Sequence, residues 1–221
     1  MASVELRGLT VQYPSARTPA LDGLDLWAQD GRFTVIAGDL RSGKSTLLRV
    51  VAGQEPPDAG RVLIGGVDVT EVPAHDRDAV IVFQNYALYP HMDVQENMSF
   101  ALRVAGVPPA ERQDRVREAA RLLDLEEQLE WTPERLTGPQ RQQVALARAV
   151  VRRPAVLLMD DPLTALPLQL KDHTAELIRS LARTLDVTTL YATAEPGPVA
   201  AVADRLLRLD SGRLREDTAV S

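Results

Sequence analysis

A glycine-rich loop followed by a lysine and a hydroxyl group is the clearest chemical feature of the sequence. Because glycines let the backbone curl, successive N–H groups can point at phosphate oxygens, and the N-terminus of a following helix adds partial positive charge. The loop matches the pattern G-x-x-x-x-G-K-[ST] and lies between a β-forming run and a run with helical spacing. The pattern predicts a site for the phosphates of ATP, formed by Gly38, Ser42, Gly43, Lys44, Ser45 and Thr46.

An apolar run that ends in two aspartates supplies the second half of the predicted site. Ala155–Met159 has the pattern of a buried strand, and Asp160 and Asp161 follow it. Asp160 would hold Mg²⁺ through water, while Lys44 reaches the β- and γ-phosphates and the Ser45 hydroxyl binds the Mg²⁺. Each pattern alone has a simpler interpretation, namely a chance glycine-rich turn or a solvated acidic turn. Together they favour a nucleotide site.

The elements that must position these residues alternate between strands and helices, which is typical of a parallel sheet with covering helices. A helix is expected at Ser45–Ala52, ending at Gly53, and another at Leu168–Leu185. The fold class is therefore α/β, with a mainly parallel core and an antiparallel β region at the N-terminus. The expected strands are Val4–Tyr13, Leu24–Trp27, Arg32–Ala37, Gly60–Val67, Ala79–Phe83, Ala155–Met159, Thr188–Thr193 and Arg205–Leu209.

Helical periodicity replaces the strand pattern from Val94 to about Trp131, and a further helix is expected at Gln140–Val151. We interpret residues 91–154 approximately as a helical lobe inserted into a single domain. The core of that domain would be formed by residues 1–90 and 155–221. The alternative is a pair of crossover helices that belong to the main sheet.

Composition narrows the possible functions. The chain has 221 residues, a formal net charge of −6 and no cysteine, so thiol chemistry is excluded and a general nucleic-acid binder is not expected. No leader-like N-terminus and no apolar stretch of membrane-spanning length are present in the sequence. We therefore expect a cytosolic protein that works at a membrane only when another chain holds it there. Disorder is expected only from Asp217 to Ser221.

Two further segments carry a specific resemblance. One runs from Val82 to His91 and contains Gln84, and the other runs from Leu136 to Ala149 and begins Leu-Thr-Gly-Pro-Gln. With the glycine-rich loop, they make the chain similar to the ATPase subunits of ABC transporters from Val4 to about Gly212. The segment around Gln84 resembles the sugar importers of the maltose type in particular.

The resemblance implies roles that the residues alone do not establish. Tyr13 would stack on adenine, whereas the residue taken by itself is equally consistent with a packing role. Gln84 would bind Mg²⁺ and couple the nucleotide to a membrane-spanning permease, whose coupling helix would enter a groove on the helical lobe. A second ATP-binding subunit would close head to tail, so that the signature residues Thr137, Gly138 and Gln140 cap ATP held by the other subunit.

The same resemblance implies a peripheral position on the cytoplasmic face of the cell membrane and an indirect connection to a solute-binding protein. Nucleic acid is not an expected partner. Many sugar-importer ATPases continue into a β-rich regulatory domain, whereas this sequence ends at Ser221, so regulation through such a domain is expected to be absent. Cargo specificity would lie in the partner proteins.

The chain departs from the family pattern mainly at positions that serve hydrolysis. Asp161 takes the place of the glutamate that polarises the attacking water, and it is one methylene shorter, so slow hydrolysis is expected. Ala194 takes the place of the switch histidine that contacts the γ-phosphate. None of His75, His91 and His173 aligns with that role, and we interpret all three as surface or packing residues.

The other departures lie in the loops. Thr137 and Pro139 replace the serine and second glycine of the signature, Pro167 replaces the D-loop aspartate, and Asp39 and Arg41 replace small uncharged residues. Three interpretations follow: a degenerate subunit paired with a more complete ATPase, a slow homodimeric ATPase, or a regulatory module that binds ATP without hydrolysing it. A soluble ABC protein that acts on nucleic acid is a weaker fourth.

Overall fold

Two sheets form the framework of the chain. The computed structural model describes residues 2–83, 86–164 and 166–220. One sheet is antiparallel with the order β2-β1-β4-β5, and the other has the order β10-β9-β3-β8-β7-β6. In the second sheet β9, β3, β8, β7 and β6 are parallel, and β10 pairs antiparallel with β9. The strands are β1 Val4–Val11, β2 Leu21–Ala28, β3 Phe33–Ala37, β4 Ala59–Ile64, β5 Val67–Asp68, β6 Ala79–Phe83, β7 Val156–Asp160, β8 Thr188–Thr193, β9 Arg205–Asp210 and β10 Arg213–Ala219.

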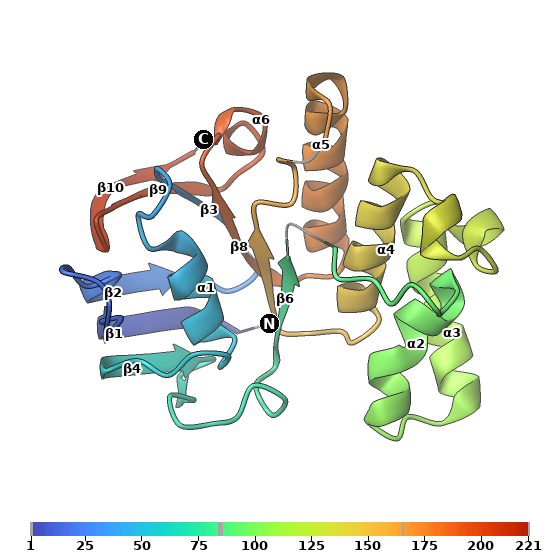
Figure 1. Ribbon diagram of the computed structural model, residues 1–221, viewed down its shortest axis with the longest axis horizontal. Coiled ribbons are helices and arrows are strands. Elements are labelled where there is room, and N and C mark those ends of the chain that lie inside the picture. The colour runs from blue at the N-terminus through green and yellow to red at the C-terminus, as the bar shows by residue number, and fades with distance from the viewer. Residues whose placement is uncertain (1, 84–85, 165, 221) are drawn as a thin grey trace.

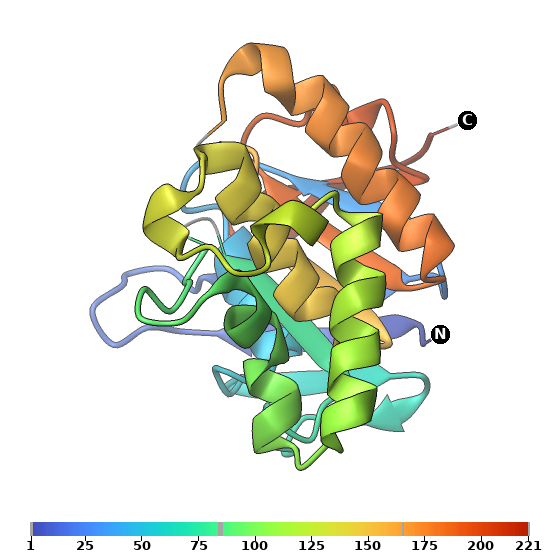
Figure 2. The same ribbon diagram turned by 90° about the vertical axis from the view of Figure 1, so that its right-hand side faces the viewer.

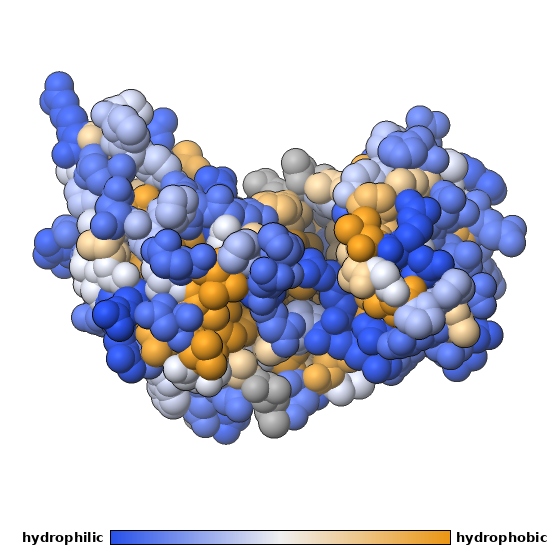
Figure 3. Space-filling view, turned by 90° about the horizontal axis from the view of Figure 1, so that it is seen from below, coloured by the Kyte–Doolittle hydropathy of each residue, from blue (hydrophilic) through white to orange (hydrophobic). Residues whose placement is uncertain are grey.

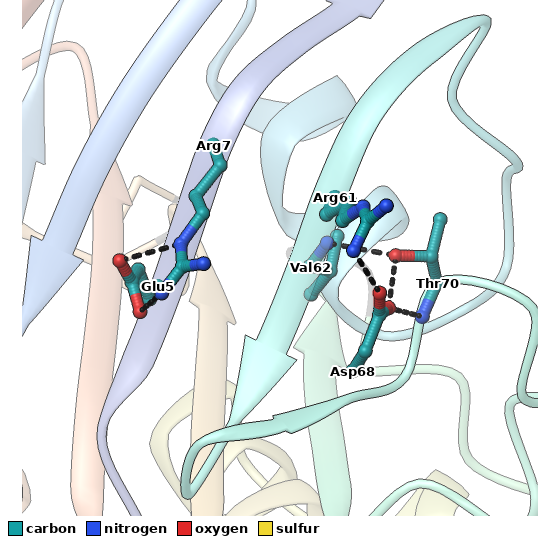
Figure 4. Close-up of polar contacts among 6 residues, drawn as sticks. All are labelled: Glu5, Arg7, Arg61, Val62, Asp68 and Thr70. Atoms are coloured by element: carbon teal, nitrogen blue, oxygen red, sulfur yellow. Dashed lines mark hydrogen bonds and ion pairs between the residues drawn. The ribbon is translucent and has the colours of Figure 1, made fainter.

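The antiparallel sheet buries one face and exposes a charged face. In β1 the register places Arg7 opposite Arg61 of β4, an arrangement of like charges that would repel without neighbouring carboxylates. Figure 4 shows how they are neutralised: Glu5 pairs with Arg7 at 2.8 Å and Asp68 with Arg61 at 3.7 Å. The Arg7 hydrogen bond lowers the pKa of Glu5. The outer face is thus a solvated charge network, and the inner face is available for packing.

Helix α1 lies between the two sheets, and the other long helices cover the opposite face of the parallel sheet (Figure 1). Leu47 and Leu48 of α1 are fully buried with the inner face of β1 and with Ile36 of β3. Phe33 and Tyr191 point to the other face of the sheet, where they join a second core formed with the helices. The helices are α1 Lys44–Val51, α2 Val94–Val104, α3 Pro109–Leu122, α4 Gly138–Val150, α5 Leu168–Thr184 and α6 Gly197–Ala200, with short 3₁₀ turns at Glu126–Gln128 and Pro133–Arg135.

The segment between β6 and β7 runs through α2, α3 and α4. Helix α4 packs against β6, and α2 and α3 pack on α4, to one side of the sheets (Figures 1 and 2). The α/β class with an antiparallel region and an inserted helical part is therefore confirmed. Helix α4 begins at Gly138 and not at Gln140, because Thr137 caps it.

Strand β10 is the main departure from the expected elements. The expectation of disorder from Asp217 is wrong for Asp217–Ala219, which pair with Arg205–Leu207 of β9. Six of the seven side chains of β10 are exposed, so no alternation of apolar residues marks the strand. The overlooked signal is the two-residue turn Ser211-Gly212, in which both residues have positive φ, as tight β-hairpins require.

Candidate functional site

Two glycines fix the shape of the loop between β3 and α1. Gly43, the N-cap of α1, has φ 104, and a Cβ there would lie 2.3 Å from the backbone oxygen of Ala20. A Cβ on Gly38 would lie 2.3 Å from the backbone oxygen of Leu209 and 2.6 Å from Ser42 Oγ. Since real side chains essentially never approach so closely, both positions require glycine and the loop is held against two neighbouring segments.

Lys44 is buried inside this loop. Its Nζ donates to the backbone oxygens of Gly38 at 2.6 Å and Asp39 at 2.8 Å, and to Ser42 Oγ at 3.2 Å. Burial lowers the pKa of Lys44, while the negative charges of Asp161, Asp160 and Asp39 oppose that shift. The ammonium group is therefore held inside the loop by two backbone oxygens and one hydroxyl, with three carboxylates nearby.

Ser45 and Asp160 meet across 115 positions of sequence. Ser45 Oγ donates to Asp160 Oδ1 at 2.9 Å. Asp160 ends β7, and α1 begins at the carboxyl edge of the same sheet, which explains the contact. One hydroxyl and one carboxylate suit Mg²⁺, which binds proteins through one or two carboxylates and takes further ligands from phosphates and water. Among the described residues no group of three or more His, Asp or Glu is arranged to hold a metal.

Tyr13 lies beside α1 in the structure. Its hydroxyl donates to Glu55 Oε2 at 2.9 Å and is 3.1 Å from Thr46 Oγ1. Burial raises the pKa of Tyr13. The ring is half-buried and its hydroxyl lies near Thr46 of α1, while adenine stacking stays a prediction.

Asp161 lies directly after Asp160 and has an unusual backbone conformation. Its φ is 47, and its N–H donates to the backbone oxygen of Ala192 at 2.9 Å. Its carboxylate accepts a hydrogen bond of 3.0 Å from Thr193 Oγ1, at the end of β8. The position expected to polarise water therefore lies beside Thr193 and the neighbouring Ala194. Thr193 is not among the residues that the sequence motifs select, although a hydroxyl at the end of a buried strand is a usable signal.

The signature residues form the start of α4. Thr137 caps the helix and Gln140 completes the capping box, donating its backbone N–H to Thr137 Oγ1 and accepting from Thr137 N at 2.9 Å. Pro139 lies in the first turn, where its missing N–H is not needed by the helix. Thr137 and Gly138 are exposed, and in the described part of the chain no hydrogen bond joins them or Gln140 to residues 38–46. Gln84 lies outside the described residues.

A groove of about 790 Å³ opens between β6, α2 and α4. Seen from below, the molecule is hollowed between the sheets on the left and the helices on the right (Figure 3). The rings of Phe100 and Tyr89 are in contact, with centroids 4.8 Å apart and planes inclined at 51°, and the Arg148 guanidinium lies 4.8 Å from the Tyr89 ring centre. The groove thus presents aromatic and cationic groups together. His75, His91 and His173 are exposed, as expected for surface residues.

Comparison with known proteins places the fold and the loop in one family. The model of the family described as "ABC transporter" matches residues 21–164. The chain belongs to the ABC transporter family. It is 48% identical to the "Diacetylchitobiose uptake system ATP-binding protein MsiK" of Streptomyces coelicolor, over 98% of this chain and 57% of that protein. It is 43% identical to the "sn-glycerol-3-phosphate import ATP-binding protein UgpC 2" of Agrobacterium fabrum, with the same coverage.

Solved cassettes of the family have the same architecture. The dimeric bacterial ABC transporter cassette MJ0796 matches with a TM-score of 0.86 and 26% identity, over 99% of both chains. A dimeric post-hydrolysis state of MJ0796, bound to ADP and Pi, matches with a TM-score of 0.85. The chain therefore has the architecture of an ABC cassette, a domain that binds nucleotide. The chain spans 57% of the length of the two curated relatives. In the part of the chain that is described, no helix is both long and apolar enough to cross a bilayer.

Proposed function

We propose that this chain binds MgATP and serves as the ATP-binding subunit of an importer for a carbohydrate or a related solute. The observation that carries the proposal is the 2.9 Å contact between Ser45 Oγ and Asp160 Oδ1, with the Lys44 ammonium in the adjacent loop. The relatives named for diacetylchitobiose uptake and for sn-glycerol-3-phosphate import support an importer of small polar solutes.

In the proposed site, one group of residues binds the phosphates and another binds the Mg²⁺. The loop amides and Lys44 bind the β- and γ-phosphates, and Lys44 exchanges its present backbone acceptors for phosphate oxygens. Ser45 holds Mg²⁺ directly and Asp160 holds it through water, and the Mg²⁺ partly neutralises the phosphates. Gln84 is the proposed third contact to the metal, and Tyr13 the proposed adenine platform.

Calorimetry with MgATP tests this site. Lys44→Ala should weaken binding by about 100-fold and Ser45→Ala by about tenfold, since charged hydrogen bonds contribute roughly 1.5–3 kcal/mol each. Ser180→Ala is the matched control, because Ser180 is exposed on α5 and should keep wild-type affinity. Equal affinity in all four proteins, or no affinity in the folded wild type, would exclude the site.

Hydrolysis is proposed to be slow, with Asp161 as the group that polarises water. Asp161 carries the required charge but is short, and Ala194 offers no polar group beside it. Turnover should be measured with the permease present. Asp161→Asn should abolish turnover and leave MgATP affinity largely unchanged, because Asp161 is not among the proposed phosphate or metal ligands. Turnover that survives this change would exclude Asp161 from the chemistry.

Two protein partners are proposed. A membrane-spanning permease would insert a helix into the groove beside α2 and α4 and hold the chain on the cytoplasmic face of the cell membrane. A second ATP-binding subunit, identical or different, would close over the loop, where Leu40 is 87% exposed, and over the start of α5, where Leu168 is 72% exposed. Head-to-tail closure supplies Thr137, Gly138 and Gln140 to the nucleotide of the other subunit.

Val104 allows a clean test of the groove. It is 72% exposed and lines the groove, so Val104→Glu should reduce co-purification with the permease by placing a charge in an apolar contact. Val67→Glu is the matched control, since Val67 is 65% exposed but belongs to β5 of the other sheet. Equal capture of both variants would place the permease elsewhere. MgATP affinity should be unchanged in both.

A further inference from the structure

The Asp161 carboxylate is oriented by a single side-chain contact in the described structure. Asp161 Oδ1 accepts from Thr193 Oγ1 at 3.0 Å, and Thr193 is buried at the end of β8. The φ of 47 at Asp161 leaves the main chain in the left-handed region, which few non-glycine residues adopt and which aspartate adopts more often than most. Ala194 carries only a methyl group, so its side chain adds no polar contact.

The hydrogen bond has a defined direction. Thr193 Oγ1 accepts the backbone N–H of Glu195 at 3.0 Å, which occupies one of its lone pairs. The single hydroxyl hydrogen can then point to Asp161 Oδ1 at 3.0 Å or to the backbone oxygen of Glu195 at 3.3 Å. Because a bond to an ionised carboxylate is the stronger of the two and is also the shorter one here, the hydrogen is assigned to Asp161.

An ion pair holds the segment that carries this hydroxyl. Lys171 Nζ, in the first turn of α5, lies 2.9 Å from Glu195 Oε2. Helix α5 is reached directly from Asp161 through residues 162–167, so the pair joins the segment after β7 to the segment after β8. The Glu195 carboxylate is exposed, so the ion pair adds little to the free energy of unfolding. It does restrain Glu195, whose backbone N–H and backbone oxygen both contact Thr193 Oγ1.

We propose that Thr193 is a positioning residue for Asp161. Its hydroxyl fixes Oδ1 and thereby leaves Oδ2 to polarise the attacking water. Because an aspartate is one methylene shorter than a glutamate, Oδ2 can reach the water only in a narrow range of side-chain orientations. The inference rests on the proposed hydrolysis of MgATP and adds a residue to it. A misplacement of about 1 Å at a reacting group can cost about 100-fold in rate, so loss of the hydroxyl should lower kcat by about 10- to 100-fold.

The test compares three variants of the full chain assembled with its permease. Thr193→Val keeps the shape and removes the hydroxyl, and Thr193→Ser restores it. Thr189→Val is the matched control, because Thr189 is fully buried on the same strand and, among the described residues, its hydroxyl hydrogen-bonds only to the backbone oxygen of Val187, at 3.3 Å. We expect kcat to fall about 10- to 100-fold in Thr193→Val alone, with MgATP affinity within about twofold of wild type.

Each contrary result has a distinct meaning. Wild-type kcat in Thr193→Val, or an equal loss in Thr189→Val, overturns the positioning role while the nucleotide site stands. A loss of MgATP affinity parallel to the loss of kcat assigns Thr193 to the structure of the site and also overturns the proposal. A wild-type complex that binds MgATP without turnover removes the reaction that Asp161 would serve, and one that binds no MgATP overturns the proposed function itself.

Discussion

The loop before α1 predicts a graded response to alanine at three glycines. Gly106 has φ 72 and open space where a Cβ would lie, so alanine there meets conformational strain alone. Gly38 has an ordinary φ but a Cβ would lie 2.3 Å from the backbone oxygen of Leu209, so alanine there meets a clash alone. Gly43 combines φ 104 with a 2.3 Å approach to the backbone oxygen of Ala20.

The magnitudes follow from these contacts. The left-handed conformation costs an alanine about 1–2 kcal/mol, which is the loss expected at Gly106. Real Cβ atoms essentially never approach a non-bonded heavy atom more closely than 3.0 Å, so a 2.3 Å approach to a backbone oxygen forces a backbone shift. Overpacking of this kind costs about 1–3 kcal/mol, which is the loss expected at Gly38. Gly43→Ala should lose about 2–5 kcal/mol, since it combines both costs.

Urea denaturation of the three variants measures the series, with constant m-values as the condition for comparing free energies. MgATP calorimetry on the folded fraction gives an independent readout, because Gly106 belongs to the turn between α2 and α3 and not to the loop, so its variant should bind normally. An equal loss of stability at Gly43 and Gly106 would refute the reasoning. It would mean that the loop moves away from Ala20 without cost and is not held by its close approach to that segment.

Three further changes test other parts of the fold. Arg77→Met should lower the free energy of unfolding, measured by urea denaturation, by ~3 kcal/mol, because the buried guanidinium donates to four backbone oxygens, including those at the end of α1. The control Arg61→Met, at an exposed position, should lower it by less than about 0.5 kcal/mol. The Arg179 hydrogen bonds lower the pKa of Asp204 in the folded protein below the ordinary value of 3.8. The ionised Asp204 carboxylate therefore stabilises the fold fully above that value, and this stabilisation is lost as the pH falls through the pKa of Asp204 in the folded state. The difference in unfolding free energy between wild type and Asp204→Asn should therefore be constant above about pH 5 and shrink below about pH 4; a pH-independent difference would contradict this. Tyr191→Phe should leave stability unchanged or raise it by up to about 1 kcal/mol, because the buried hydroxyl has no hydrogen-bond partner in the part described; a loss above about 1 kcal/mol would reveal one.

Local signals made much of the fold predictable. The glycine-rich loop, the helix after it and the apolar strands each depend on residues within a short window, and all appear near their expected bounds. The approach of Ser45 to Asp160 was predictable as well, because parallel strands bring their carboxyl ends to one edge. Strand β10 was not, since its exposed side chains carry no alternation and its formation depends on pairing with β9.

Contacts that depend on register could not be predicted from the sequence. The bond from Thr193 to Asp161 requires β7 and β8 to pair so that Asp160 lies opposite Ala192. A shift by one residue would turn Thr193 to the other face of the sheet. The backbone oxygens that accept from Lys44 could not be predicted either, because which oxygens face the ammonium group depends on the loop conformation and not on residue types. Helix α4 begins at Gly138, before the expected start at Gln140, because Thr137 caps it.

The order of the strands explains why Thr193 lies where it does. β8 is placed between β3, which leads into the Lys44 loop, and β7, which ends at Asp160. All three strands are parallel, so the last residue of β8 must lie at the same edge, between the two halves of the proposed nucleotide site. A polar side chain there is close to Asp161 and to the proposed phosphate site. The topology therefore creates a position for a group that orients Asp161, and in this chain a threonine hydroxyl occupies that position.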